Sequence, residues 1–207
     1  MARRSIWFLP EHYYHIYNRG NNKEPIFLSD DNYHFFLRRL HHYYDQAAVQ
    51  LIAYCLMPNH YHLLIYIHKE IDFSNVMRAF TISYTRSFNN WHRRVGHLFQ
   101  SDFQARGIER DGYLPHLCRY IHLNPVKSML VKNPEDWEYS DYRDWISIKQ
   151  PTTRIEQSAR EMGYLLTFSK YELRDELFGS AHEYKIFVMD FAEEQRLQKK
   201  IEKYLFG

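Results

Sequence analysis

Hydrophobic residues along roughly the first two thirds of the chain follow two different periods, which predicts strands interleaved with helices. Aliphatic and aromatic runs of strand length, bounded by turn signals, predict four strands. These strands span residues 13–19, 49–57, 60–67 and 97–108. Apolar residues at helical spacing predict two helices between them, one from Ser29-Asp30-Asp31 to about Tyr44 and one from a cap at Ser74 to Trp91.

The resulting order is strand, helix, strand, strand, helix, strand. With right-handed crossovers, this order folds most simply as a ferredoxin-like βαββαβ unit of the α+β class. A four-stranded antiparallel sheet would then carry both helices on one face. Leu63, Ile65 and Ile67 would point to that covered face, so the opposite face of the sheet would remain open.

A third helix is predicted from Tyr113 to about Leu123. Its apolar stripe at i, i+3, i+4 and i+7 consists of Leu114, Leu117, Cys118 and Ile121. Pro125 disfavours helical geometry at Asn124, so the helix is expected to end there. Such a helix can lie across the open sheet face and carry Tyr120 toward it.

A His-x-His pair, His60 and His62, follows the predicted turn at Pro58-Asn59 and begins the third strand. Side chains alternate along a strand, so both imidazoles would lie on the open face, where their nitrogens can converge on one metal ion. The chain holds 13 histidines, however, so an ordinary pair of strand residues is also compatible with the pattern. His15, Tyr17 and Arg19 share one face of the first strand, either as solvated residues or as an aromatic and basic lip beside the pair.

Composition narrows the class of protein. A hydrophobic content of 45% with 18 Tyr, 14 Phe and 4 Trp is typical of a globular domain. No apolar run approaches the ~20 residues of a membrane span, and the short apolar stretch that Pro10 interrupts is too brief for a signal-peptide core. Cys55 and Cys118 show neither metal spacing nor a disulfide framework, which fits a reducing compartment. We therefore expect a cytoplasmic protein with no membrane partner.

The net charge of +2 neither requires nor excludes a nucleic-acid partner. Arginines are frequent on the polar positions of the second helix and just beyond it. A charged helix face is commonly only solvated, but a face of one sign also suits a phosphate backbone. The candidate DNA-contacting residues are Arg19, Arg78, Arg86, Arg93, Arg94 and Arg106.

Four sequence blocks resemble the single-tyrosine HUH transposases, most closely the REP-associated tyrosine transposases and their insertion-sequence relatives. The blocks are Asn18–Asn22 with Pro25–Phe27, Ala53–Leu64, Gly96–Gln100 and Arg119–Lys127. A weaker fifth block, Trp137–Arg143, is similar to the Trp-Ser-Ser-Tyr ending of that family. The resemblance covers about residues 13 to 146, and the second and fourth blocks are its most specific parts.

The resemblance implies a ferredoxin-like fold and a DNA-cleaving chemistry. In this family the His pair binds a divalent metal, Mg²⁺ or Mn²⁺, and the tyrosine attacks a phosphodiester of single-stranded DNA beside a hairpin. Carried over, His60 and His62 are metal ligands, Tyr120 is the nucleophile, and Asn124 is the third ligand. The implied product is a 5′-phosphotyrosine with a free 3′-hydroxyl. The third helix is then the catalytic helix.

One departure from the family pattern is the segment Ser101-Asp102-Phe103-Gln104, which stands where relatives have Gly-Arg-Phe-Lys and which lacks their positive charges. Two other interpretations stay open. One is a catalytically silent, sequence- or hairpin-specific DNA-binding protein derived from such a transposase. The other is a small-molecule metallohydrolase, although no further well-spaced His and Asp ligands are evident. Relatives include monomers and dimers that exchange the tyrosine helix, so the sequence is compatible with a homodimer or a monomer.

Residues 147–207 are expected to form a helical C-terminal extension to the transposase-like domain of residues 1–146. Residues 167–178 and 182–206 are predicted helices. Either they extend the packed core or they make an accessory contact with hairpin DNA.

Overall fold

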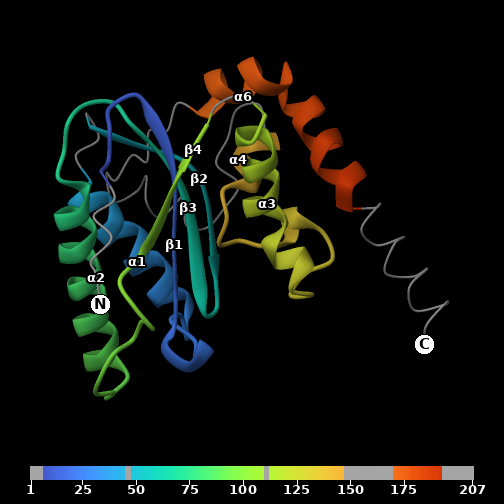
Figure 1. Ribbon diagram of the computed structural model, residues 1–207. Helices are drawn as coiled ribbons and strands as arrows, with labels where there is room; N and C mark the ends of the chain where they lie inside the picture. Colours follow the sequence, from blue (N-terminus) through green and yellow to red (C-terminus); the bar gives the residue numbers. More distant parts are fainter. Residues whose placement is uncertain (1–6, 45–47, 110–111, 147–169, 193–207) are drawn as a thin grey trace, which may run out of the picture.

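A four-stranded antiparallel sheet forms the centre of the computed structural model, which describes residues 7–44, 48–109, 112–146 and 170–192. The sheet order is β2-β3-β1-β4, as expected for a ferredoxin-like βαββαβ unit. The strands are β1 (His12–Arg19), β2 (Val49–Met57), β3 (His60–Ile67) and β4 (Gln104–Ile108). The predicted α+β fold is confirmed, and Figure 1 shows the sheet edge-on between two helical layers.

The first helical layer consists of α1 (Asp30–Tyr43) and α2 (Phe73–Trp91), which pack side by side on one face of the sheet. Their apolar stripes meet the alternate residues of the strands that point to this side. The result is a core rich in aromatic rings, in which Phe36, Tyr61, Phe80 and Tyr84 are completely buried.

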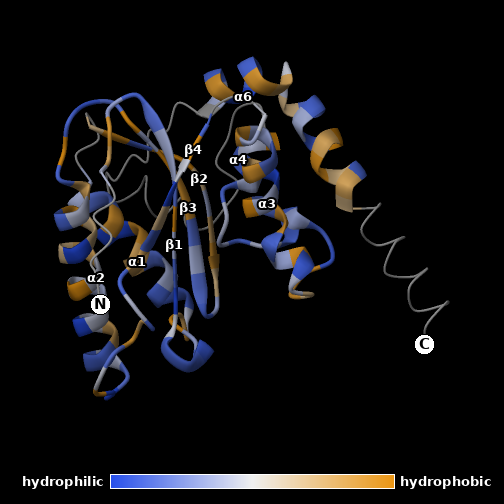
Figure 2. Cartoon of the chain, in the orientation of Figure 1, coloured by the Kyte–Doolittle hydropathy of each residue, from blue (hydrophilic) through white to orange (hydrophobic). Residues whose placement is uncertain are grey.

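Strands β2 and β3 form a hairpin across the turn at Pro58-Asn59. A register shift between Leu51 and Ala53 marks a bulge in β2. Nearly every residue of β2 is buried, and the strand is largely orange in the hydropathy view of Figure 2. A strand that is apolar on both faces must be covered on both, so the second face of the sheet is not left to solvent.

The second layer lies on that opposite face and contains α3 (Leu114–Lys127), α4 (Tyr142–Ile146), α6 (Lys170–Phe178) and a helix over residues 181–192. Leu64 from the sheet, Leu117 from α3 and Tyr184 and Val188 from the C-terminal helix share one buried cluster. The described part of the extension therefore packs against the core. The predicted domain boundary after residue 146 and the predicted helical residues 167–169 and 193–206 lie outside the described residues.

Single 3-10 turns occupy the loops, as η1 (Asn21–Lys23) and η2 (Pro134–Asp136). No helix in the described ranges combines the length and apolarity needed to cross a bilayer.

Two predicted boundaries were wrong. The fourth strand begins at Gln104 rather than at residue 97, because Leu98 and Phe99 are both buried and their segment bonds to the loop after β1 instead. Asn21 donates its backbone N–H to Leu98, and Gly20 pairs with Phe99 in an isolated bridge. Helix α2 begins at Phe73, and its cap is Asp72 rather than Ser74: the Asp72 carboxylate accepts a hydrogen bond from the Asn75 N–H.

The predicted end of the third helix was also wrong, because α3 continues through Pro125 to Lys127. A proline inside a helix leaves the carbonyl four residues earlier, here that of Ile121, without its N–H donor. The Asn124 side-chain amide lies 3.4 Å from that carbonyl and 2.8 Å from the carbonyl of Tyr120. This substitute donor compensates for the missing bond and lets the helix continue.

A completely buried polar cluster holds α3 in place. Asp141, just before α4, accepts hydrogen bonds from the backbone N–H of Tyr54 in β2 at 2.6 Å and from the Trp145 indole at 3.1 Å. His122 of α3 contacts the same carboxylate through Nε2 at 3.0 Å and the Tyr184 hydroxyl through Nδ1 at 2.5 Å. The tautomer with its proton on Nε2 satisfies both contacts, since the hydroxyl then donates to Nδ1. The sheet, α3 and the C-terminal helix are thus joined by one set of hydrogen bonds.

Replacement Asp141→Asn tests this cluster. The amide group of Asn would face either the Trp145 indole or the Tyr54 N–H, and a buried donor that faces a donor costs roughly 2 kcal/mol of unfolding free energy. We expect a decrease in Tm of about 4–8 °C in thermal unfolding followed by circular dichroism. The exposed Asp190, replaced by Asn, is the matched control and should change the unfolding free energy by less than about 0.5 kcal/mol. Equal Tm values for the two variants would contradict the assigned role.

Candidate active site

His60 and His62 both lie on the face of β3 that α3 covers, as strand alternation predicts, whereas Tyr61 points into the opposite core. Their ring centroids are 5.1 Å apart and the ring planes are nearly perpendicular, at 86°. His62 is buried, and His60, at the start of the strand, is partly exposed. Two imidazoles therefore converge at one end of the sheet.

Each histidine of the pair uses Nδ1 for a hydrogen-bonding contact inside the protein. His60 Nδ1 lies 2.6 Å from the side-chain oxygen of Asn59, and His62 Nδ1 lies 2.9 Å from Nε2 of His15. Such contacts fix the orientation and tautomer of metal-binding histidines. They leave Nε2 of each ring as the nitrogen for a ligand.

Burial keeps these rings neutral, which is the form that binds metals. Burial, assisted by the nearby Arg19 guanidinium, lowers the pKa of His60 to about 4. Burial and the neighbouring rings of His15 and His60 lower the pKa of His62 well below its usual value. Burial, together with Arg106, likewise lowers the pKa of His15 to about 4.

Helix α3 brings Tyr120 to this pair across the covered face of the sheet. The Tyr120 ring centroid lies 5.5 Å from that of His62 and 6.4 Å from that of His15, in both cases edge to face. The side chain is 39% exposed, so a substrate can reach it. Burial of the remainder raises the pKa of Tyr120, the Asn124 side chain opposes this, and the phenols of Tyr113 and Tyr17 add to the increase.

Asn124 lies one helical turn after Tyr120 and is buried. Its amide nitrogen bonds to the carbonyls of α3, so its side-chain oxygen is the atom left for a ligand. Among the described residues, no group of three or more His, Cys, Asp or Glu side chains is arranged to hold a metal ion. A metal at this site would accordingly rest on the two histidines and an amide oxygen, a donor set of neutral nitrogen and oxygen that fits Mn²⁺ or Mg²⁺.

The six candidate DNA-contacting arginines separate into two groups. Arg19 pairs with His60 across β1 and β3, and its buried Nε has no hydrogen-bond partner in the described part of the chain. Arg106 of β4 pairs with His15. The others, Arg78, Arg86, Arg93 and Arg94, lie on α2 or directly after it, and α2 packs on the opposite face of the sheet.

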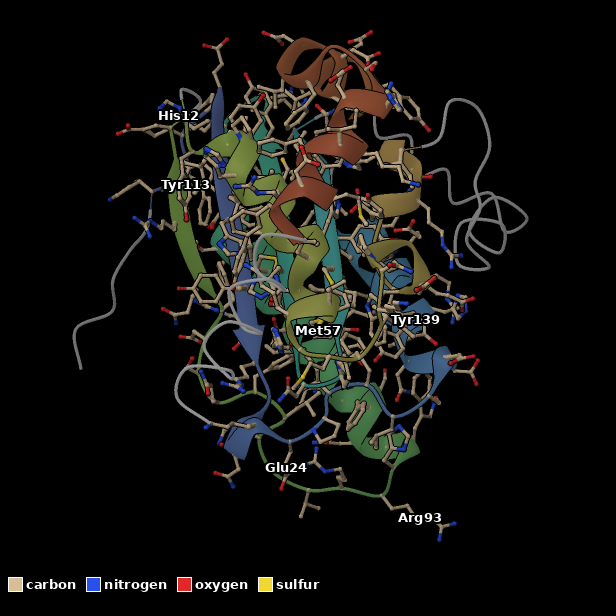
Figure 3. The ribbon with its side chains drawn as sticks, turned by 90° about the vertical axis from the view of Figure 1, so that its right-hand side faces the viewer. His12, Glu24, Met57, Arg93, Tyr113 and Tyr139 are labelled. Atoms are coloured by element: carbon tan, nitrogen blue, oxygen red, sulfur yellow. The ribbon has the colours of Figure 1, made fainter. Side chains whose placement is uncertain are left out.

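Within that second group, Arg94 forms an ion pair of 2.8 Å with Glu24. Arg93 lies far from Tyr113 in Figure 3. Only Arg19 and Arg106 are thus brought to the histidines, and a role of any of the six in DNA binding stays a prediction.

The alternation of β1 placed His15 with Tyr17 and Arg19, in one interpretation as a lip beside the pair, but it did not predict the contact of His15 with His62. The sequence does not show the register in which β1 pairs with β3. Pairing of β1 with β3 aligns Tyr17 with His62, which brings the imidazole of His15 to Nδ1 of His62. Asn59, read only as a turn residue, also contacts the site through His60.

Comparison with known proteins gives consistent results. The family model described as "Transposase IS200 like" matches residues 9–124. A Haemophilus influenzae protein named as a REP-associated tyrosine transposase is 28% identical over 108 residues, which cover 47% of this chain and 61% of that relative. A solved structure of a REP-associated tyrosine transposase bound to a REP hairpin is similar with a TM-score of 0.60 at 18% identity, over 70% of this chain and 86% of that chain.

The structural similarity concerns the fold, whereas the family model covers the strands, the His pair and the helix up to Asn124. The match extends over more than half of the chain and ends at the last of the predicted site residues. The chain belongs to the family of IS200-like transposases.

Proposed function

We propose that this protein is a metal-dependent endonuclease and strand transferase that cleaves single-stranded DNA next to hairpin repeats through a 5′-phosphotyrosine intermediate. One observation supports the proposal most strongly. Tyr120, which is partly exposed and belongs to the helical layer, has its ring centroid 5.5 Å from that of His62 in the sheet. The relative's name and the REP hairpin bound to the solved neighbour support DNA as the substrate.

In the proposed reaction the Tyr120 hydroxyl oxygen attacks the phosphorus of a phosphodiester. A bond forms between this oxygen and phosphorus, the bond from phosphorus to the 3′-oxygen breaks, and the phenol proton leaves to solvent while the 3′-oxygen gains a proton. Because one ester replaces another, the bond energy is retained, and a second 3′-hydroxyl can displace Tyr120 and join the strands. One tyrosine therefore suffices for cleavage and for transfer.

His60, His62 and Asn124 would hold the metal ion. A bound Mg²⁺ or Mn²⁺ supplies positive charge to the phosphate oxygens, where negative charge develops. The protein itself contributes orientation: Asn59 and His15 fix the two imidazoles, and α3 fixes the nucleophile. Because burial raises the pKa of Tyr120, the phenol is neutral at pH 7 and must lose its proton during the attack.

Substitution Tyr120→Phe removes only the nucleophilic oxygen. We expect complete loss of a denaturation-resistant covalent adduct when the protein is incubated with Mn²⁺ and labelled single-stranded DNA from a family-like hairpin, as measured by gel electrophoresis. Binding of the same DNA in a mobility-shift assay should be retained within about threefold, since the ring still packs beside His62.

Tyr113→Phe is a matched control, because it removes a phenol oxygen from the same helix and should still give the adduct. Wild-type protein that binds hairpin DNA but forms no adduct with any such substrate would favour the catalytically silent DNA-binding protein. Hydrolysis of a generic phosphodiester that persists in Tyr120→Phe would favour a metallohydrolase.

Removal of the imidazole that contacts His62 should weaken metal binding. Loss of such a supporting contact typically costs about 10- to 100-fold in metal affinity. We expect a decrease of this size in Mn²⁺ affinity for His15→Phe, measured by isothermal titration calorimetry without DNA. His12→Phe is the control on the same strand, because His12 is exposed and its Nδ1 contacts the Pro10 carbonyl. Equal affinities for His15→Phe and wild type would contradict the supporting role of His15.

A further inference from the structure

Aromatic rings that remain exposed are unequally distributed over the molecule. The described aromatic side chains with large exposed fractions are Trp7, Tyr17, Trp91, Tyr113, Tyr120 and Tyr171. Two of them, Tyr17 and Tyr120, contact the histidines, and Tyr113 lies at the start of the helix that holds Tyr120. Since Tyr120 has the role of nucleophile, the other two require an explanation of their own.

Tyr17 extends the row of rings on β1. It is 37% exposed and lies on the same strand face as His15, with ring centroids 4.9 Å apart and a tilt of 35°. Its ring centroid is 6.2 Å from that of His62, which faces it across the β1–β3 pairing. One side of the Tyr17 ring is therefore supported by the site, and more than a third of its surface is open to solvent.

Tyr113 lies at the start of α3, and Figure 3 shows it toward the end of the sheet where β1 begins at His12. It is 47% exposed, and the Arg106 guanidinium carbon lies 5.7 Å from its ring centroid. Arg106 also faces His15 in the sheet. An open aromatic ring and a cation are thus combined at one edge of the site, seven residues or about two helical turns before Tyr120.

This combination of groups contributes little to the stability of the fold, because exposed tyrosine rings bury little surface. It does match the chemistry of an unpaired DNA strand, in which flat bases stack on aromatic rings and phosphates pair with guanidinium groups. Tyr17 lies beside His62, whose ring contacts Tyr120, and Tyr113 precedes Tyr120 on the same helix, so both phenols lie on the elements that carry the site.

We infer that Tyr17 and Tyr113 each bind one unpaired nucleobase by stacking, on either side of the phosphate that Tyr120 attacks, and that Arg106 holds a phosphate between or beside these bases. The inference rests on the proposed function. It assigns DNA-binding roles to three residues that are neither proposed metal ligands nor the proposed nucleophile. Stacking accepts any base, so these residues would fix the path of the strand rather than its sequence.

The test measures binding without metal and without cleavage. Fluorescence anisotropy in EDTA compares a fluorescein-labelled oligothymidylate of twelve nucleotides with an abasic strand of the same length and charge. Stacking of one base typically corresponds to about a 5- to 100-fold change in affinity. Tyr17→Ala and Tyr113→Ala should each weaken oligothymidylate binding by a factor in this range and leave abasic binding unchanged. Tyr17→Phe should bind like wild type, because the ring is retained.

Two controls separate stacking from charge and from general surface effects. Arg106→Gln should weaken binding of both strands and reduce the dependence of affinity on salt. Tyr171→Ala removes a tyrosine of similar exposure, 39%, on α6, and should leave both affinities within about twofold.

Equal effects of Tyr17→Ala and Tyr113→Ala on the two strands, or no effect on either, would overturn the inference. The proposed function is judged separately by the adduct at Tyr120, which these variants still contain. An adduct that forms while the alanine variants bind normally refutes only the stacking roles. Base-dependent loss of binding in a protein that forms no adduct supports the stacking roles and refutes the enzyme.

Discussion

A buried carboxylate constrains this structure more than any other single group. Asp141 is removed from solvent and must be fully hydrogen-bonded to be tolerated there, so β2, α4 and α3 have to supply donors at fixed positions. His122 is two residues from Tyr120 on α3. A rotation or shift of the helix that turned Tyr120 away from His62 would therefore break the contact between His122 and Asp141. The cost of that break therefore adds to the ring contacts with His62 and His15 in holding Tyr120 in place.

The two faces of the sheet differ in their exposure to solvent. The face toward α1 and α2 is a closed aromatic core. The other face begins as a second core under the N-terminal half of α3 and opens to solvent where Tyr17, His60 and Tyr120 gather. Rigid strands carry the histidines and a packed helix carries the tyrosine, so both halves of the site are positioned by regular structure rather than by loops.

Much of the fold follows from the sequence because β2, β3, α1 and α2 have clear periodicity, and the alternation in β3 correctly put His60 and His62 together. The errors at α2 and α3 arose where a side chain replaced a backbone partner, and the error at β4 arose where its segment bonded to the loop after β1. The Asn124 amide donates to the Ile121 carbonyl, which has no backbone donor because residue 125 is proline. Helix propensities do not include such a side-chain hydrogen bond. The contact between His15 and His62 depends on strand register, and the role of His122 depends on Tyr184, which follows 62 residues later. Such long-range pairs leave no local pattern in the chain.

The contact between His122 and Tyr184 makes the position of α3 depend on a residue near the C-terminal end of the described chain. A polypeptide that extends only as far as α4 already holds both imidazoles of the pair and the Tyr120 phenol. It lacks Tyr184, however, so the inner nitrogen of His122 has no donor and the apolar side of α3 that residues 173–192 cover is bare. A polypeptide truncated after α4 would therefore be expected to hold Tyr120 less firmly against His62, although it contains both side chains.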